Sequence, residues 1–183
     1  MNKKTTSKIQ LFLKFTLEFI LLAVLSVIYF IGMNIFNYQN KPKLWAIILL
    51  IFSISKVYLF ISITFKKLDN LIKNNHAFNH ALLLFSIVIS ILIISFTIDY
   101  LCASEIYPNA FNGIQQDQLL IARFTNLLYY SVVTFSGVGY GDISPNLAIS
   151  KLITVLEIIT SFVMIVFIIS KYFGINKEQN LKK

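Results

Sequence analysis

The sequence contains 183 residues, of which 57% are hydrophobic and 13% are charged. A soluble domain typically has about 45–50% apolar and about 25% charged residues, so this chain has too little polar surface to coat a water-soluble globule. The composition also excludes a disordered chain and a collagen-like fibre, and the single cysteine, Cys102, excludes a disulfide-rich secreted module. The class that remains is a polytopic membrane protein.

Four apolar stretches are each long enough to cross a hydrocarbon layer, which needs about 20 helical residues. They lie at residues 15–36, 44–65, 80–101 and 148–172. In lipid the backbone must satisfy its own hydrogen bonds, so each stretch is predicted to be a helix. A cleaved signal peptide is the competing interpretation of the first stretch. That stretch is longer than a signal core, and residues 34–38 contain no small-residue cleavage site.

The distribution of basic residues predicts the orientation in the membrane. With a cytoplasmic N-terminus, eleven basic residues lie inside and four lie outside, where four acids accompany them. The inner residues are Lys3, Lys4, Lys8, Lys14, Lys66, Lys67, Lys73, Lys171, Lys177, Lys182 and Lys183; the outer ones are Lys41, Lys43, Arg123 and Lys151, with Asp99, Glu105, Asp117 and Asp142. We therefore expect a cell-membrane protein whose N-terminus (1–14), linker (66–79) and tail (173–183) are cytoplasmic. The net charge of +8 is a topology signal, and no nucleic acid partner is expected.

The connection between the third and fourth stretches changes character along its length. Residues 102–118 are polar and are expected to form an extracellular turret. Residues 119–135 are apolar again, but they are too short to span a membrane, and glycines end the run. An apolar segment of half length between two full spans predicts a re-entrant helix.

Residues 134–142 then read Thr-Phe-Ser-Gly-Val-Gly-Tyr-Gly-Asp, so three of the six glycines fall within five residues. Glycine reaches left-handed conformations without steric cost. Its alternation with Val138 and Tyr140 allows successive carbonyls to face one side, where they can bind a cation. With its flanking stretches, this segment resembles the pore module of potassium channels, whose Thr-Val-Gly-Tyr-Gly filter replaces the water shell of the ion with carbonyls. The resemblance covers residues 80–172, in the order outer helix, pore helix, filter and inner helix.

The resemblance implies an all-α polytopic membrane protein: four transmembrane helices, a re-entrant pore helix and a selectivity filter, assembled as a homotetramer in the bilayer. It implies passive K+ flux, no enzymatic activity and no cofactor besides the permeant ion. The implied filter comprises Ser136, Gly137, Val138, Gly139, Tyr140 and Gly141, with K+ bound by the carbonyls of Gly137, Val138, Gly139 and Tyr140. The implied supporting residues are Tyr129, Tyr130, Thr134, Asp142 and Glu157. Asp142 is expected to hydrogen-bond to Tyr129 or Tyr130, or else to be a solvated loop acid, and Glu157 to face the pore helix as a brace.

Two positions depart from the family pattern. Gly137 stands where the filter usually has threonine, so it keeps the carbonyl and loses the hydroxyl. Residues 157–162 of the inner helix contain no hinge glycine, and Ser161 bends a helix only mildly. Two alternatives therefore stay open beside a potassium-selective channel. One is a weakly selective cation channel, and the other is a non-conducting membrane subunit that regulates another channel.

The first two stretches, residues 15–65, are expected to form a peripheral hairpin beside the pore module. They contain no arginine and no array of basic residues, which a voltage sensor needs, so steep voltage gating is not expected. Lys56 lies inside the second stretch, where an unpaired charge is costly. A partner is therefore expected, and Glu18 on the neighbouring helix is one candidate. We expect a structural ion pair or hydrogen bonding to Ser53 and Ser55, and a modest role in gating is the alternative.

Overall fold

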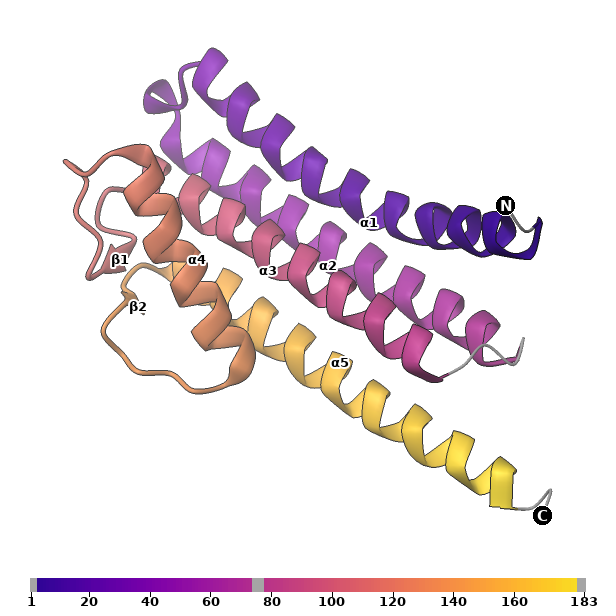
Figure 1. Ribbon diagram of the computed structural model, residues 1–183. Coiled ribbons are helices and arrows are strands. Elements are labelled where there is room, and N and C mark those ends of the chain that lie inside the picture. Colours follow the sequence, from indigo (N-terminus) through magenta and orange to yellow (C-terminus); the bar gives the residue numbers. More distant parts are fainter. Residues whose placement is uncertain (1–2, 74–77, 181–183) are drawn as a thin grey trace.

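The computed structural model describes residues 3–73 and 78–180, and within these ranges the chain is almost entirely helical (Figure 1). The elements in chain order are α1 (Lys3–Ile35), the short 3-10 helix η1 (Tyr38–Asn40), α2 (Pro42–Lys73), α3 (Phe78–Ile106), β1 (Phe111–Asn112), α4 (Leu120–Ser136), β2 (Ser144–Pro145) and α5 (Ala148–Asn180). Helices α1, α2, α3 and α5 each contain an apolar window long enough to cross a membrane: Leu17–Ile35, Pro42–Lys66, Phe85–Ile106 and Ala148–Phe167. The prediction of four membrane-spanning helices is confirmed to this extent.

The long helices continue beyond the apolar stretches that predicted them. α1 already begins at Lys3, α2 continues to Lys73 and α5 continues to Asn180. Hydropathy marks where a chain leaves the lipid, whereas lysine, glutamine and glutamate sustain a helix in water as well. The segments 1–14, 66–79 and 173–183 are therefore helical wherever they are described, and residues 1–2, 74–77 and 181–183 lie outside the described residues.

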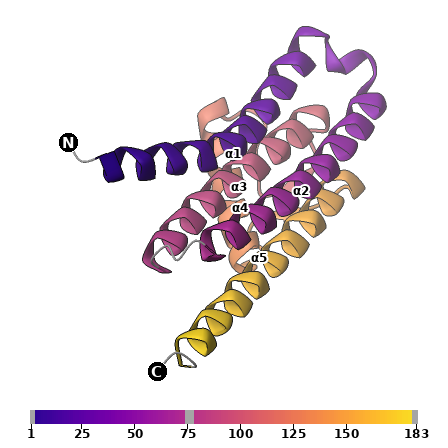
Figure 2. The ribbon, with the colours of Figure 1, turned by 90° about the vertical axis from the view of Figure 1, so that its right-hand side faces the viewer.

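Helix α3 occupies the centre of the bundle. It contacts α1, α2, α4 and α5, and 61% of its apolar window is buried, against 22% of the window in α1. The first residues of α1 and the last of α5 lie at one end of the bundle, which faces the viewer in Figure 2, and β1 and β2 lie at the other end (Figure 1). α4 lies alongside α3 and α5 near this second end (Figure 1). The contacts of α4 with α3 and α5 therefore lie near the end of the bundle that contains β1 and β2.

Two very short strands are the departure from the predicted all-α fold in the described part of the chain. β1 and β2 pair antiparallel, with Phe111 opposite Pro145 and Asn112 opposite Ser144. The carbonyl of Ala110, next to β1, accepts hydrogen bonds from the backbone N–H of Asn146 (2.8 Å) and from Ser150 Oγ (2.6 Å). These contacts join the segment before α4 to the segment after it, so they hold both ends of the connection that contains α4.

Candidate functional site

The C-terminal end of α4 is closed by a glycine cap. Gly137 has φ 73° and ψ 14°. Its N–H donates to the carbonyl of Thr134 (3.1 Å), and the N–H of Val138 donates to the carbonyl of Val133 (3.1 Å). This pair of bonds is a Schellman motif, in which the residue after the helix must adopt a left-handed conformation that suits glycine. The end of a helix carries about half a negative charge, and residues 137–142 follow it directly.

The backbone of the following segment alternates in handedness. Gly137, Gly139 and Gly141 have φ values of 73°, 61° and 81°, and the intervening Val138 and Tyr140 have negative φ. Such an alternation is the backbone pattern that lets successive carbonyls face the same side, as the row of carbonyls in a cation filter requires. The side chains of Val138 and Tyr140 are 54% and 70% exposed. The segment is therefore covered little by its own chain.

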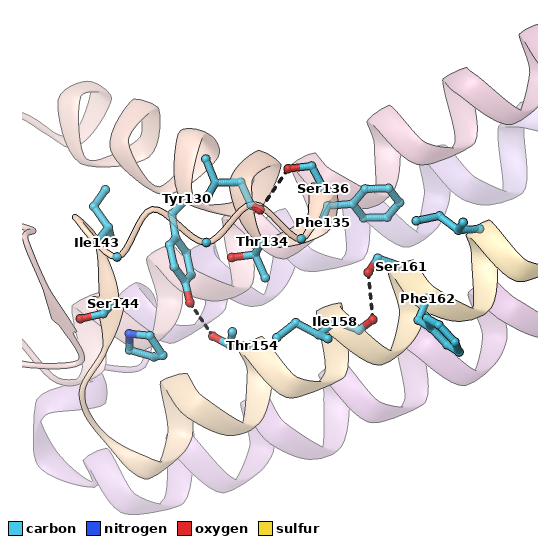
Figure 3. Close-up of a pocket in the computed structure, with 16 residues that line it drawn as sticks. Tyr130, Thr134, Phe135, Ser136, Ile143, Ser144, Thr154, Ile158, Ser161 and Phe162 are labelled. Atoms are coloured by element: carbon cyan, nitrogen blue, oxygen red, sulfur yellow. Dashed lines mark hydrogen bonds between the residues drawn. The ribbon is translucent and has the colours of Figure 1, made fainter.

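Asp142, at the end of this segment, has contacts on two sides. Its carboxylate interacts with the nearby Tyr129 hydroxyl of α4 and raises the pKa of Tyr129 above its ordinary value. Its carbonyl oxygen lies 2.4 Å from the position that a Cβ on Gly113 would occupy. Only glycine fits that approach, and Gly113 also has a positive φ of 83°. Of the two tyrosines considered from the sequence, Tyr129 is thus the one influenced by Asp142. The Tyr130 hydroxyl lies 2.9 Å from Thr154 Oγ1 (Figure 3).

Glu157 joins three helices at a buried position. Its side chain is fully buried in α5. One carboxylate oxygen accepts from Ser131 Oγ of α4 and the other from Tyr100 Oη of α3, each at 2.5 Å. The Tyr100 ring also packs edge-on against the rings of Tyr130 (5.1 Å between centroids) and Phe111 (5.4 Å). Glu157 thus faces α4 of its own chain.

A cavity of about 510 Å³ lies between the glycine segment and α5 (Figure 3). Its lining combines the end of α4, the three glycines after it and one face of α5. Six lining residues bring hydroxyl groups to a wall that is otherwise mostly apolar: Tyr130, Thr134, Ser136, Ser144, Thr154 and Ser161. Ser136 and Ser161 hydrogen-bond to backbone carbonyls three residues earlier, at 3.1 Å and 2.8 Å.

Comparison with known proteins identifies the family. Residues 81–177, more than half of the chain, match the family model described as ion channel. The chain belongs to the ion channel family. It is also 30% identical over 70 residues to two-pore potassium channel 4 of Arabidopsis thaliana; the match covers 38% of this chain and 23% of the plant protein. No solved structure matches the chain.

Membership of this family, together with the four apolar helices, confirms the expectation of an ion-transporting membrane protein with transmembrane helices. It also places the chain among transport proteins rather than enzymes. The matched residues 81–177 contain α4, the glycine segment and Glu157. The chain spans about a quarter of the length of the plant channel, so the activity of that whole protein is not carried over here.

One expectation about the hairpin of this channel was wrong. Lys56 forms its ion pair with Asp99 of α3, with 2.5 Å between Nζ and Oδ2, rather than with Glu18. Lys56 Nζ also lies 3.4 Å from Ser26 Oγ of α1, and Ser26 comes eight residues after Glu18. Eight residues are about 12 Å along a helix, so Glu18 is at the wrong depth to be the partner. Asp99, which the charge count had assigned to the outer surface, is 1% exposed.

The serine alternative for Lys56 was also wrong in its detail. Ser53 Oγ donates to Asp99 Oδ2 (2.7 Å), and Ser55 Oγ donates to the carbonyl of Ile51 (2.8 Å). Sequence reasoning also missed Tyr100 and Ser131 as the partners of Glu157. The available signal was the occurrence of polar residues inside apolar helices, since such residues are costly in lipid and usually pair with one another.

Proposed function

We propose that this chain is the subunit of a potassium-selective channel, with residues 136–142 as its filter and K+ bound by the carbonyls of Gly137, Val138, Gly139 and Tyr140. The observation that carries the proposal is the alternating backbone of the glycine segment, placed directly at the C-terminal end of α4. The partial negative charge of that helix end favours a cation nearby. The match of part of the chain to a potassium channel of Arabidopsis thaliana agrees with K+ as the ion.

In this proposal α4 is a re-entrant pore helix. It contains 17 residues, whereas a spanning helix needs about 20. Ser131, through Glu157 and Tyr100, ties α4 to both helices beside it. The interaction of Tyr129 with the nearby Asp142 supports a role for both residues in holding the filter, beside Tyr130 and Thr134.

A homotetramer is proposed because one chain supplies only one row of carbonyls, and the filter of potassium channels is formed by four. Exposed apolar side chains of α5 line the cavity and continue past it: Phe162 in the lining is 67% exposed, and Ile169 beyond it is 51% exposed. Val138 and Tyr140 of the filter are exposed as well. Neighbouring subunits on a fourfold axis would cover these surfaces, in keeping with closed symmetry.

In the membrane we place both ends of the chain in the cytoplasm and β1 and β2 outside, as the lysine distribution favours. Voltage gating of the usual type is not part of the proposal. The basic residue inside the α2 span, Lys56, is buried and paired, whereas a voltage sensor needs several charges that move together.

A weakly selective cation channel is the second candidate, and Gly137 is the observation that favours it. The residue caps α4 in a left-handed conformation and has no hydroxyl to offer at the inner end of the filter. Permeability to K+ and Na+, measured on the purified protein, distinguishes the two candidates.

The test is flux from vesicles that contain only the purified protein. We expect K+ efflux that exceeds Na+ efflux in the wild type. Gly139→Ala should abolish this preference, because Gly139 has φ 61° and a left-handed conformation costs a residue with a Cβ about 1–2 kcal/mol in each subunit. The matched control is Gly32→Ala in α1, where nothing lies within 4 Å of the added Cβ; this variant should behave as the wild type.

Each other outcome decides against part of the proposal. Normal discrimination by Gly139→Ala would show that the filter lies elsewhere. Equal K+ and Na+ flux in the wild type would favour the weakly selective channel. A well-folded protein with no flux at all would point to a regulatory subunit that does not conduct by itself.

A further inference from the structure

A row of buried polar contacts crosses the molecule from the hairpin to α4. It begins at Lys56 of α2, which is paired with Asp99 of α3. Asp99 is followed by Tyr100, which donates to Glu157 of α5, and Glu157 in turn accepts from Ser131 of α4. Each of these five side chains is at most 2% exposed. Four helices therefore meet through one set of polar contacts in an otherwise apolar bundle.

The cost of this arrangement argues that the position of the ion pair matters. A buried charge is costly unless it is paired, and replacing a buried ion pair with apolar residues is often neutral or even stabilising. If the pair served only to hold α2 against α3, leucine or phenylalanine in place of Lys56 and Asp99 would thus do so at least as well. What a charged pair adds is directional geometry, since it holds two helices at one depth and one rotation.

Asp99 depends on α2 for its described contacts. Its Oδ2 atom receives hydrogen bonds from Lys56 Nζ (2.5 Å) and Ser53 Oγ (2.7 Å), and both donors belong to α2. Its Oδ1 atom has no hydrogen-bond partner among the described residues. Lys56 is held in place by the carbonyl of Ser95 (3.2 Å) and by the ring of Phe96, 5.1 Å from its Nζ. The hairpin therefore fixes the side of α3 on which Asp99 lies.

Tyr100, the next residue of α3, lies on a different face of the same helix turn. Successive residues of an α-helix are about 100° apart, so a rotation of α3 that moves Asp99 also moves Tyr100. The Tyr100 hydroxyl bonds to Glu157, and its ring packs against Tyr130 of α4. Ser131 and Tyr130 lie in the last two turns of α4, before the glycine cap at Gly137. The rotation of α3 is thus coupled by contact to the helix that ends at the proposed filter.

We propose that Lys56 is a positioning residue for ion selection: through Asp99 and Tyr100 it sets the position of Glu157 and Ser131, and so of α4 and the filter. The proposal rests on the function proposed above. It gives the α1–α2 hairpin a role in permeation that does not require movement of charge across the membrane field. The hairpin holds α3 in place, because the ion pair between Lys56 and Asp99 fixes the rotation of α3 about its own axis.

The test is a double-mutant cycle read out as the K+/Na+ permeability ratio of purified tetramers in vesicles. Lys56→Met alone would leave Asp99 as an unpaired buried charge. The first variant of the cycle, which changes the hairpin side, therefore combines Lys56→Met with Asp99→Asn and removes both charges; it is called the charge-neutral pair. The other side is Glu157→Gln. We expect each side to lower the ratio by about 2- to 30-fold, the usual range for coupling between distant residues. The combined variant should lower it by less than the product of the two effects, because both break the same row of contacts.

Two controls separate positioning from stability. Lys66→Met removes an exposed lysine of the same helix and should leave the ratio unchanged. Lys56→Arg keeps the charge and should retain most of the wild-type ratio. If the charge-neutral pair yields no tetramers, Ser53→Ala replaces it, since this variant keeps the ion pair and removes one of the two anchors of Asp99; a lowered ratio is then expected.

Several results would overturn the proposal. A lower melting temperature with an unchanged permeability ratio would make the ion pair purely structural. Strictly multiplicative effects of the two sides would show that they act independently. If the wild type is selective and Gly139→Ala is not, but the Lys56 variants keep the ratio, then only this inference fails. If the wild type does not conduct, both the inference and the function on which it rests are wrong.

Discussion

Gly137 shows how one residue can satisfy two requirements. It ends α4 through the Schellman bonds, which need a left-handed residue. In the proposed filter it also supplies the innermost carbonyl. The potassium channel family that this segment resembles usually has threonine at the position of Gly137. Threonine is β-branched and would be strained at a φ of 73°. The lost hydroxyl is thus explained by the local backbone, although nothing lies within 4 Å of a Cβ at this position.

This backbone argument predicts different results for two replacements of Gly137. Gly137→Asn should fold and assemble with a small loss of stability, because asparagine tolerates the left-handed conformation. Gly137→Thr should be less stable by about 1–2 kcal/mol per subunit and should yield fewer tetramers. Thermal unfolding and size-exclusion chromatography of the two variants measure the difference. Equal stability of the two variants would mean that the segment adopts another backbone conformation in the assembled protein.

At the scale of elements, the position of α4 is fixed from two directions. Buried contacts of Ser131 and Tyr130 attach it to α3 and α5. On its other side, the Tyr129 hydroxyl interacts with the nearby Asp142, after the glycine segment. α4 and the glycine segment after it are therefore joined by the chain itself and also by the interaction between Tyr129 and Asp142. Gly113, packed against the carbonyl of Asp142, adds the segment before the helix to the same arrangement.

The interaction between Tyr129 and the nearby Asp142 predicts an effect on the outer end of the segment. Tyr129→Phe should keep the fold, because the side chain is 40% exposed, and should weaken discrimination between K+ and Na+. The matched control is Tyr58→Phe on the exposed face of α2, where the side chain is 71% exposed. Permeability ratios of the two variants provide the measurement. Identical ratios in Tyr129→Phe and the wild type would remove Asp142 and Tyr129 from the proposed support.

The raised pKa of Tyr129 gives this prediction a pH dependence with a definite sign. The nearby Asp142 carboxylate favours the protonated hydroxyl, and it raises the pKa above the ordinary value of about 10. Its contribution is therefore fully present below pH 10 and is lost as the pH rises through the raised pKa. The difference between the wild type and Tyr129→Phe should be constant around neutral pH and shrink only in strongly alkaline solution.

At the scale of the whole molecule, the even number of spanning helices places both ends of the chain on one side. β1 and β2 lie at the opposite end of the bundle from the start of α1 and the end of α5 (Figure 1). In the orientation proposed above from the lysine distribution, the side with the two termini is cytoplasmic. Cys102, the sole cysteine, is fully buried. We therefore expect no reaction of the wild-type protein with a thiol reagent, so that labelling reports only on introduced cysteines.

Labelling with a membrane-impermeant thiol reagent tests this orientation. A cysteine at Asn112, which is exposed in β1, should react in intact cells. A cysteine at Lys66, exposed near the other end of α2, should react only after the membrane is permeabilised. Reaction of Lys66→Cys in intact cells, with Asn112→Cys protected, would invert the topology.

The sequence by itself determined the class of protein, the four spanning helices and the glycine segment, because hydropathy over about 20 residues and the spacing of glycines are local properties of a chain. Tertiary structure alone decided which polar groups meet. Lys56 pairs with Asp99 instead of Glu18, and Glu157 binds Tyr100 and Ser131 together. Such pairs depend on the relative depth and rotation of whole helices. Apolar helix faces can contact lipid on every side, so hydropathy does not determine the depth or the rotation of a helix. Depth and rotation are fixed only when the helices pack against one another.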